Sequence, residues 1–590
     1  MKILLVHPGD SVEVGPWTET RWDWVVDLGW SGHDTYLRQG RKLGCRVVSI
    51  YDLLDPELHR HRVRDLLAVG LDQLVDSESV DWWDAFSSYV YDRLEQLLQL
   101  AALAEQIPEH ARIFATSSHY ALLALPQLLS GKLGNYKINV LSEGTRREPG
   151  LYSRLHRHWK TASTLRPSQL AEIAFDKWDT DFSLRRHFAS SPKKSPSPVI
   201  LLPSAYVNVS RSQVAYARML PHLHFLLVTT RHSGCLPGLP QNVEHRSLAS
   251  YATRLRISTS EEAASLRAKW LAMNRGLFES NSVLRLANQL HWLDRFERLL
   301  MPAMRVRDAW REVLIREPVV AVLSADENNL YTRLPIWLAK SRKLPTVFCD
   351  HGALNMSATV RRTLSDSYIV RGEMAKDYYV TLGGPSADRI VVGSPAGAHN
   401  PLPSQNDSSQ SLTGQTNKDW IVFYSEPYEL FSGRTQALYS ELLPELCRLA
   451  QRTNRKVIVK LHPFENLGER RELVGRVVPS EQHALIEVRE GPMHPELFAR
   501  AWCSFTMESS VAVESTMHGV PCFLCGWFDA SWYSYSEQYA KFSAGYLLDS
   551  PGKIRTVPEL MELLHITEET KHKLESPINS EQLEAVLSGQ

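Results

Sequence analysis

The 590-residue chain has 66 basic and 66 acidic side chains, so its formal net charge at neutral pH is zero. A chain of this length exceeds what one hydrophobic core supports, and we expect at least two domains. Balanced charge creates no overall field that attracts nucleic acid, so we expect no nucleic-acid partner. It does not exclude a local patch for peripheral association with a membrane.

The first residues, MKILLVHPGD, predict a first strand and not a secretory signal. Their apolar part, residues 3–6, is shorter than the apolar region of a signal, and no small-residue cleavage site follows. We find no apolar run near the ~20 residues of a membrane span. The seven cysteines are scattered and odd in number, which favours reduced thiols over a disulfide framework. These features predict a cytoplasmic protein, with peripheral association at the inner face of the membrane left open.

Short apolar runs alternate with longer helical patterns over the first 396 residues. Runs that stay apolar, without alternation, are typical of parallel strands covered on both faces, so the α/β class follows. Residues 256–316 are rich in Leu, Arg, Ala, Glu and Trp at helical spacing, and we predict a helical insertion there. We predict strands at residues 2–6, 46–50, 113–116, 138–141, 199–203, 225–229, 319–323, 346–349, 367–370 and 390–392.

Residues 397–419 are polar, with Pro, Ser, Gln, Asn and Gly, which is the composition of a linker. A second α/β series follows, so we expect two Rossmann-like doubly wound domains, residues 1–396 and 420–590, that face each other across a cleft. Ligands of such sheets bind beyond the carboxyl ends of the strands. Strands of the second series are expected at residues 421–424, 457–461, 485–488, 503–506, 522–524 and 545–548.

Polar residues follow the strands of this second series where they end. The first strand runs into Ser425, and the second, KVIVKLHP, ends in Lys460 and His462. Pro463 stops the strand because proline fixes φ and has no N–H for the sheet. Lys460 lies two residues before the imidazole, on the same face of the strand. We expect both side chains to point at a phosphate group.

A short helix is predicted for VAVESTMHG, after the fourth strand of the series. Ser509 or Ser510 is a natural N-cap, and Gly519 ends the helix. A helix start with free N–H groups and two hydroxyls suits a phosphate. Glu514 lies one turn after Ser510, where its carboxylate can accept the hydroxyls of a ribose. The alternative is that Ser510 only caps the helix and that Glu514 is solvated.

Residues 508–526, ESSVAVESTMHGVPCFLCG, resemble the donor-binding segment of GT-B fold glycosyltransferases. Lys-x-His-Pro with a later Ser-Ser is similar to bacterial surface-polysaccharide transferases that use cytidine-nucleotide donors. These include polysialyltransferases, capsule Kdo transferases and CDP-glycerol glycerophosphotransferases. The resemblance covers roughly residues 318–550 and implies a nucleotide-sugar donor, with a cytidine nucleotide as one option. The donor-binding residues that we assign on this basis are Lys460, His462, Glu508, Ser509, Ser510, Glu514 and Ser425.

The stretch TVFCDHGALN ends a predicted strand at His351. The glycerophosphotransferases carry a comparable His-Gly, and the resemblance implies that His351 takes the proton of the acceptor hydroxyl, a task for which histidine is the usual residue. Asp326 or Glu327, on the strand before it, is the alternative base or orients His351. The adjacent Asp350 could raise the basicity of His351, although neighbouring residues on a strand point to opposite faces.

These patterns together predict a metal-independent glycosyltransferase that moves a sugar from a nucleotide-sugar donor to a surface glycan, a polysaccharide or a lipid-linked acceptor. We expect no metal and no further cofactor, because cations and N–H groups can stabilise the departing phosphate. Three alternatives stay open: CDP-glycerol-type glycerophosphate transfer, a UDP-sugar 2-epimerase of the same fold, and a non-catalytic scaffold of polysaccharide assembly. The sequence leaves open the donor, the acceptor, the stereochemistry, the oligomeric state and the role of residues 1–317.

Overall fold

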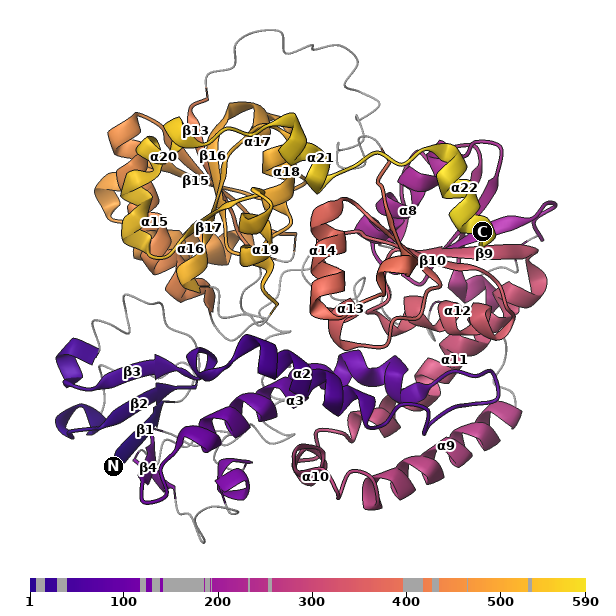
Figure 1. The fold of residues 1–590 in the computed structure, drawn as a ribbon, viewed down its shortest axis with the longest axis horizontal. Coiled ribbons are helices and arrows are strands. Elements are labelled where there is room, and N and C mark those ends of the chain that lie inside the picture. The colour runs from indigo at the N-terminus through magenta and orange to yellow at the C-terminus, as the bar shows by residue number, and fades with distance from the viewer. Residues whose placement is uncertain are drawn as a thin grey trace, which may run out of the picture.

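The computed structural model describes residues 1–6, 16–28, 40–116, 124–129, 138–141, 185, 192, 194–231, 234–252, 257–395, 418–426, 434–463, 465–528 and 533–590. They form three parallel β-sheets, each accompanied by helices (Figure 1). The predicted α/β class is therefore confirmed. Residues 397–417 of the expected linker lie outside the described residues.

The first sheet has five parallel strands. The first strand in the chain lies in the middle, the second and third are added on one side of it, and the fourth and fifth are added on the other side. This is the doubly wound order, in which the point of reversal opens a crevice at the carboxyl ends of the strands. In spatial order the strands are β3 (Arg46–Ser49), β2 (Trp24–Asp27), β1 (Lys2–Val6), β4 (Arg112–Ala115) and β5 (Asn139–Val140).

The central sheet has the same winding with seven parallel strands. The winding changes side between the first and the fourth strand of this sheet, counted along the chain. In spatial order the strands are β8 (Val243–Ser247), β7 (His224–Thr229), β6 (Val199–Ser204), β9 (Val319–Ser324), β10 (Thr346–Cys349), β11 (Ser367–Val370) and β12 (Ile390–Val392).

The C-terminal sheet is doubly wound as well, with six parallel strands. Each strand expected from the sequence of this part is present within a few residues. In spatial order the strands are β15 (Ile486–Arg489), β14 (Lys456–Lys460), β13 (Trp420–Tyr424), β16 (Ala501–Thr506), β17 (Cys522–Cys525) and β18 (Tyr546–Leu548).

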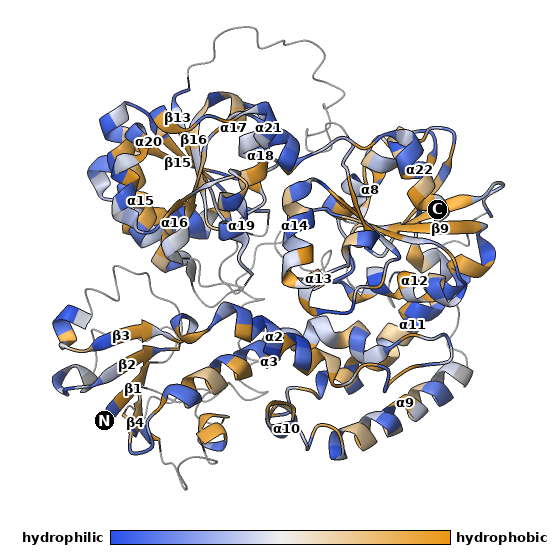
Figure 2. Cartoon of the chain, in the orientation of Figure 1, coloured by the Kyte–Doolittle hydropathy of each residue, from blue (hydrophilic) through white to orange (hydrophobic). Residues whose placement is uncertain are grey.

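Apolar residues concentrate in the strands, and polar residues lie on the outer turns of the helices (Figure 2). The helices of the first two sheets are α2 (Pro56–Ala68), α3 (Trp82–Gln106), α8 (Val207–Met219), α9 (Ile257–Arg275), α10 (Ser282–Gln289), α11 (Arg295–Arg316), α12 (Leu330–Ser341), α13 (Ser357–Val360) and α14 (Glu373–Leu382). Those of the C-terminal part are α15 (Arg434–Thr453), α16 (Leu467–Val477), α17 (Pro495–Arg500), α18 (Val511–Met517), α19 (Tyr535–Lys541), α20 (Val557–Leu563), α21 (Glu568–Leu574) and α22 (Ser580–Ser588).

The expected helical insertion is present as α9, α10 and α11. These helices do not stand apart, because they pack with α3 and α12 into one apolar core that also includes strands of the first two sheets. Trp270 stacks on Phe296 with 4.2 Å between the ring centroids, which joins α9 to α11. The insertion therefore belongs to the core that the first sheet and the central sheet share.

Residues 1–396 hold two sheets where we expected one domain. Apolar runs predict that a strand exists, but the choice of its neighbours depends on helices that pack from distant parts of the chain. Two strands were not expected, β2 and β8. The first has only three apolar residues, and the second lies at a sheet edge, where exposed polar residues interrupt its apolar pattern.

The last helix leaves the C-terminal domain to which we assigned residues 420–590. Leu583 and Val586 of α22 belong to the apolar core of the central sheet, and Figure 1 shows this yellow helix beside β9. Helix α21 passes so close to the start of α14 that a Cβ at Gly372 would collide with the carbonyl oxygens of Lys573 and Leu574. The C-terminal chain thus joins the two domains by direct backbone contact.

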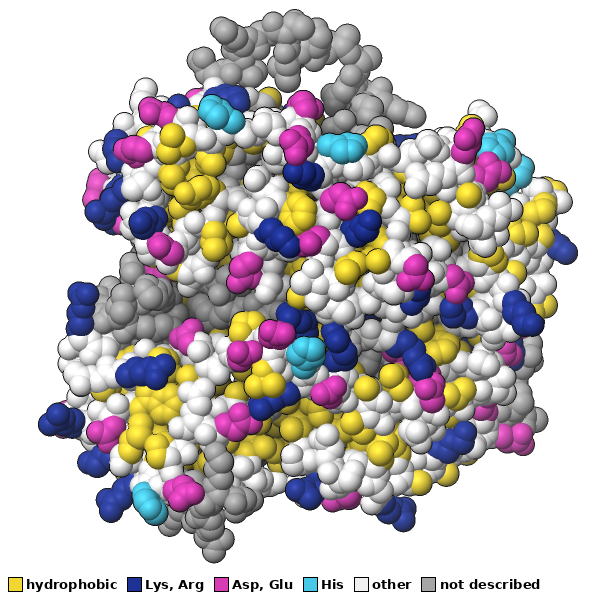
Figure 3. All heavy atoms as spheres, viewed as in Figure 1, with side chains coloured by type: hydrophobic (Ala, Val, Ile, Leu, Met, Phe, Trp, Pro, Cys, Tyr) yellow, Lys and Arg dark blue, Asp and Glu magenta, His cyan; other side chains and the backbone are white. Residues whose placement is uncertain are grey.

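The surface seen in Figure 3 carries basic and acidic side chains that are interspersed over its elements. This view shows no large patch of one sign. None of the helices that the structure describes is long and apolar enough to cross a membrane.

Candidate functional site

His351 follows β10 at the carboxyl edge of the central sheet. Its Nδ1 atom lies 2.6 Å from the carbonyl oxygen of Ala325, which directly follows the neighbouring strand β9. A carbonyl oxygen only accepts hydrogen bonds, so Nδ1 carries the hydrogen and Nε2 of the neutral ring keeps a lone pair. The half-buried ring is thereby held in the tautomer in which Nε2 carries the lone pair.

Asp350 points away from this imidazole. Its Oδ1 atom accepts a hydrogen bond of 2.8 Å from the hydroxyl of Tyr379 on α14. Burial raises the pKa of Asp350 to about 7, against the opposing effects of the Tyr379 hydrogen bond and the Arg371 charge. The opposite orientation that strand geometry predicts for these neighbours is therefore present, and Asp350 does not orient the His351 ring.

Asp326 and Glu327, the alternative bases, both have structural partners. The Oδ1 atom of Asp326 accepts from the backbone N–H groups of Asn328 and Asn329, at 2.8 and 3.2 Å, in the turn that leads into α12. Glu327 accepts from the backbone and hydroxyl of Ser365 and from the hydroxyl of Tyr368. Both carboxylates are about 95% buried. The structure brings both carboxylates to the same sheet edge as His351, where their oxygens already accept hydrogen bonds from the protein.

Ser425 and Lys460 lie at neighbouring strand ends of the C-terminal sheet. The Ser425 hydroxyl donates to Glu465 and accepts from Tyr439, both at 2.8 Å. The Lys460 ammonium donates to the carbonyl oxygens of Leu461 and Gly491, both at 2.7 Å. Burial lowers the pKa of Lys460. Two of its three donors thus serve the loops, and only the remaining N–H is left for a ligand.

His462 follows β14, and its loop is held by a residue that was not among the predicted site residues. Glu465 accepts from the backbone N–H of His462 at 2.8 Å and from Nε of Arg470 at 2.7 Å, and its side chain is fully buried. Burial lowers the pKa of His462, and the Lys460 charge lowers it further. The available signal was an acid three residues after the histidine, in the order His-Pro-x-Glu.

Glu508, Ser509 and Ser510 connect β16 to α18. Glu426, at the end of β13, accepts from the Glu508 backbone N–H at 3.4 Å and from the Thr506 hydroxyl at 3.1 Å. Glu426 was not predicted either, although it directly follows Ser425. The residues before α18 thus lie at the reversal point between β13 and β16, where doubly wound sheets bind ligands.

The expected N-cap of α18 needs correction. Ser510 has helical backbone angles and makes no capping hydrogen bond through its side chain, because a capping hydroxyl needs an extended backbone. Ser509 accepts from the Val511 N–H only at the long distance of 3.5 Å. The expected end of the helix is correct, since Gly519 follows it with φ of +70°. The two hydroxyls therefore contribute little to the helix itself.

Glu514 lies on α18 where the C-terminal domain meets the central one. Burial raises its pKa, and the charges of Arg371, His518 and Arg211 oppose this rise. Arg371 follows β11 of the central sheet and donates to the backbone carbonyl of His351 at 3.2 Å. Arg371 therefore donates to the backbone of His351, and its charge also acts on the Glu514 carboxylate.

Apolar contacts hold these two segments together. Ala353 and Leu354, which follow His351, pack in one cluster with Ala512 and Val513 of α18. The loop that carries the base is thus in contact with the helix that carries Glu514. The structure therefore assembles the His351 segment and the 508–514 segment, which are more than 150 residues apart, at one domain interface.

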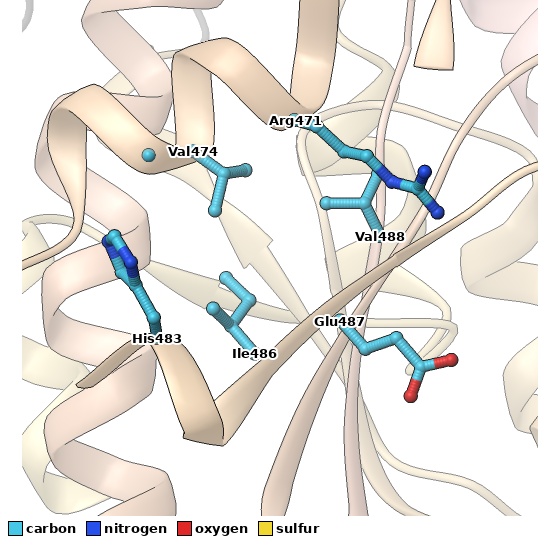
Figure 4. A pocket seen from close by; sticks show the side chains of 7 residues that line it. Arg471, Val474, His483, Ile486, Glu487 and Val488 are labelled. Atoms are coloured by element: carbon cyan, nitrogen blue, oxygen red, sulfur yellow. The ribbon is translucent and has the colours of Figure 1, made fainter. Parts of the chain in front are cut away.

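A pocket of about 290 Å³ lies elsewhere, between α16 and the edge strand β15 (Figure 4). Glu487 beside it pairs with Lys456 and Arg489 at 2.7 and 2.6 Å. None of the predicted site residues lines this pocket. Its lining consists of Arg471, Val474, Gly475, His483, Ile486, Glu487 and Val488.

Metal-ligating side chains do not gather in the described ranges, in which no group of three or more His, Cys, Asp or Glu residues could hold an ion. The polar side chains at the strand ends include imidazoles, guanidinium groups and hydroxyls. Fold and site together define an α/β protein of doubly wound parallel sheets with polar groups at two facing carboxyl edges.

Comparison with known proteins gives likeness in fold only. No protein-family model matches the chain, and no curated protein matches it. The UDP-GlcNAc 2-epimerase of Methanocaldococcus jannaschii is 12% identical with a TM-score of 0.41 and covers 64% of this chain and 98% of its own. The S. aureus MnaA–UDP structure is 13% identical with a TM-score of 0.38, covering 65% and 91%. The calicheamicin glycosyltransferase CalG4 is 14% identical with a TM-score of 0.35, covering 67% and 95%.

Proposed function

We propose that the chain is a GT-B-like glycosyltransferase that moves a sugar from a nucleotide-sugar donor to a glycan, polysaccharide or lipid-linked acceptor. The observation that carries the proposal is the hydrogen bond from His351 Nδ1 to Ala325. It leaves Nε2 as a base at a sheet edge that meets the 508–514 segment of the other domain. A positioned histidine of this kind is the usual group for taking a proton from a hydroxyl.

The donor binds at the carboxyl edge of the C-terminal sheet in this proposal. The half-buried imidazole of His462 and the hydroxyls of Ser509 and Ser510 contact the diphosphate, and Glu514 accepts the ribose hydroxyls. The support is the common location of these residues at the ends of β14 and β16, beside the reversal point of the sheet. Lys460 contributes its one remaining N–H donor and its charge.

Chemistry then proceeds by displacement at the anomeric carbon. His351 Nε2 accepts the proton of the acceptor hydroxyl while that oxygen forms its bond to the anomeric carbon. The bond from this carbon to the phosphate oxygen breaks, and the electron pair leaves with the nucleoside diphosphate. The Arg371 guanidinium and the imidazole of His462 stabilise the negative charge on the departing oxygen, without a metal ion.

Two alternative enzymes share this site. CDP-glycerol-type transfer uses the same histidines, with attack at phosphorus instead of carbon. A UDP-sugar 2-epimerase needs carboxylates around the sugar ring, and the partners of Asp326 and Glu327 disfavour this role. The transferase is therefore the function that the contacts support best. Surface-polysaccharide synthesis, a cytidine donor and peripheral association with the inner face of the membrane remain parts of this proposal.

The test is a thermal-shift panel with CMP, CDP, UDP, GDP and ADP on the wild type and three variants. One nucleotide at 100 times its Kd should add about 2.7 kcal/mol of stability. His462→Ala should lose this shift. His351→Ala should keep it and lose about 10²- to 10⁴-fold in transfer rate, which is the usual worth of a general base. His565→Ala, an exposed histidine on the surface, is the matched control and should behave as the wild type.

If no nucleotide shifts the melting temperature of the well-folded protein, the transferase proposal is contradicted. The alternative of a non-catalytic scaffold of polysaccharide assembly is then favoured. If His462→Ala keeps the nucleotide-dependent shift, the proposed location of the donor site at the end of β14 is contradicted.

A further inference from the structure

Two arginines at the carboxyl edge of the central sheet lie over tyrosine rings. Arg231 follows β7, and its Cζ atom lies 4.7 Å from the ring centroid of Tyr206, which follows β6. Arg295 begins α11, and its Cζ atom lies 5.1 Å from the ring centroid of Tyr89 on α3. These four residues form what we call the Arg–Tyr group.

The two stacks are neighbours. Burial, with smaller effects of the phenols of Tyr331 and Tyr206, raises the pKa of Tyr89 to about 12. The charges of Arg295 and Arg231 oppose this rise. The stacks are joined by geometry, because the Tyr206 hydroxyl accepts from Asn329, the N-cap of α12, and α12 packs against α3, which carries Tyr89. The group therefore joins the N-terminal part, through α3, to the reversal point of the central sheet.

The two arginines differ in burial, since Arg231 is partly buried and Arg295 is exposed. Within the described part of the chain, Arg231 and Arg295 have no ion pair, and the buried Nε of Arg231 has no hydrogen-bond partner. Other arginines of the same domains are paired, as Arg246 is with Glu317 at 2.6 Å and Arg307 with Asp76 at 2.6 Å. A buried N–H without a partner is rare and calls for a ligand or water. A guanidinium offers five donors in a planar fork that fits a carboxylate or a phosphate.

The group also shares an edge with the proposed base. The Tyr206 hydroxyl accepts a hydrogen bond of 3.1 Å from the side-chain amide of Asn329, in the loop after β9. His351 donates a hydrogen bond to the carbonyl oxygen of Ala325 in the same loop. Strand β7 is three places from β10 in the sheet, which corresponds to about 14 Å at the usual strand spacing. An elongated acceptor can contact both the Arg–Tyr group and His351.

We propose that the Arg–Tyr group is the acceptor subsite and binds the oxyanion of a negatively charged acceptor, either a sugar phosphate or a uronate. Tyr206 and Tyr89 offer ring faces for the sugar, while Arg231 and Arg295 bind the anionic oxygens. This inference rests on the proposed transferase, because it assigns the acceptor class of that site. It also gives residues 1–317 a role, since Tyr89 forms one wall of the subsite.

The test uses the full chain with the donor site filled by the nucleotide that the thermal-shift panel selects. Glucose 1-phosphate, glucuronate and glucose are titrated by calorimetry into the wild type and into Arg231→Gln, Arg295→Gln and Arg218→Gln. Arg218 is an exposed arginine near the end of α8, and its variant is the matched control. Melting temperatures of all variants establish that they are folded.

At least one of the two anions should bind at least about tenfold more tightly than glucose, because charge-assisted hydrogen bonds are about twice as strong as neutral ones. The tighter anion identifies the acceptor class. Arg231→Gln and Arg295→Gln should each weaken that anion by about tenfold or more, and Arg218→Gln should not. Equal binding of glucose and the anions, absence of anion binding, or anion affinity that both variants retain would overturn the proposal.

Failure of the donor proposal is visible separately. If no nucleotide binds, the same three titrations on the nucleotide-free chain still measure the affinity of the Arg–Tyr group for anions. The preference of the wild type for an anion over glucose is measured without any variant.

Discussion

Asp84 and Arg333 form a buried, two-pronged ion pair between α3 and α12. The guanidinium donates to both carboxylate oxygens at 2.6 to 2.8 Å, and the two side chains are 2% and 1% exposed. Arg333 also donates to the carbonyl oxygens of Glu327 and Arg362. This pair therefore fixes the N-terminal part to the same loop that carries the candidate bases.

Asp84→Asn should destabilise the protein by about 3–5 kcal/mol, because it leaves the Arg333 charge buried without its counter-ion. Urea unfolding of the wild type and the variant measures the loss. The matched control is Glu105→Gln, which breaks the exposed pair of Glu105 with Arg62 and should cost less than about 1 kcal/mol. Equal losses in the two variants would mean that the buried pair does not hold the domains together.

Glu465→Gln should loosen the His462 loop, because it weakens the bonds from Ser425, the His462 backbone and Arg470. We expect a loss of about 1–3 kcal/mol in stability and weaker nucleotide binding, measured by urea unfolding and by calorimetry. Glu469→Gln is the control, since that carboxylate lies four residues further on and is exposed. Unchanged nucleotide affinity in Glu465→Gln would separate this loop from the donor site.

Asp350 should make stability depend on pH. Its pKa is about 7 in the folded chain and near 3.8 when exposed, so between these values the folded state binds one more proton than the unfolded state. Stability should therefore fall as pH rises from about 4 to about 7, with a contribution of up to ~1.4 kcal/mol per pH unit. Asp350→Asn, which keeps an oxygen for the Tyr379 hydroxyl, should flatten this slope in urea unfolding at several pH values.

A slope that persists unchanged in Asp350→Asn would assign the pH dependence to other groups, such as Glu514, whose pKa is also raised.

Leu583→Ala should destabilise the central domain, although the residue belongs to the last helix of the chain. Leu583 is fully buried in the core of the central sheet, and truncation of such a side chain costs about 2–5 kcal/mol. Leu563→Ala is the control, because Leu563 is 75% exposed and should change stability by less than about 0.5 kcal/mol. Hydrogen exchange should show the loss in β9 and β10; protection that changes only in the C-terminal sheet would contradict this packing.

Much of the fold could be predicted from local sequence. Continuous apolar runs indicated parallel strands, and five of the six expected C-terminal ranges both begin and end within one residue of those observed, such as residues 457–461 against β14, Lys456–Lys460. Gly519 after α18 was predicted because only a residue that tolerates positive φ ends a helix in this way. The grouping of strands into sheets could not be predicted, because it depends on packing between segments more than 100 residues apart.

The sequence by itself determined the α/β class and the chemistry available at the strand ends, since both follow from residue types and short spacings. Only the tertiary structure decided which groups remain able to act. The Ala325 carbonyl accepts from Nδ1 of His351, Asp326 accepts from the backbone of its own turn, and Glu327 accepts from Ser365, 38 residues further along the chain. The packing of Ala353 against Ala512 and Val513 brings Glu514 to the same interface. The physical reason is that hydrogen-bond partners and burial, unlike strand patterns, are contributed by residues far away along the chain.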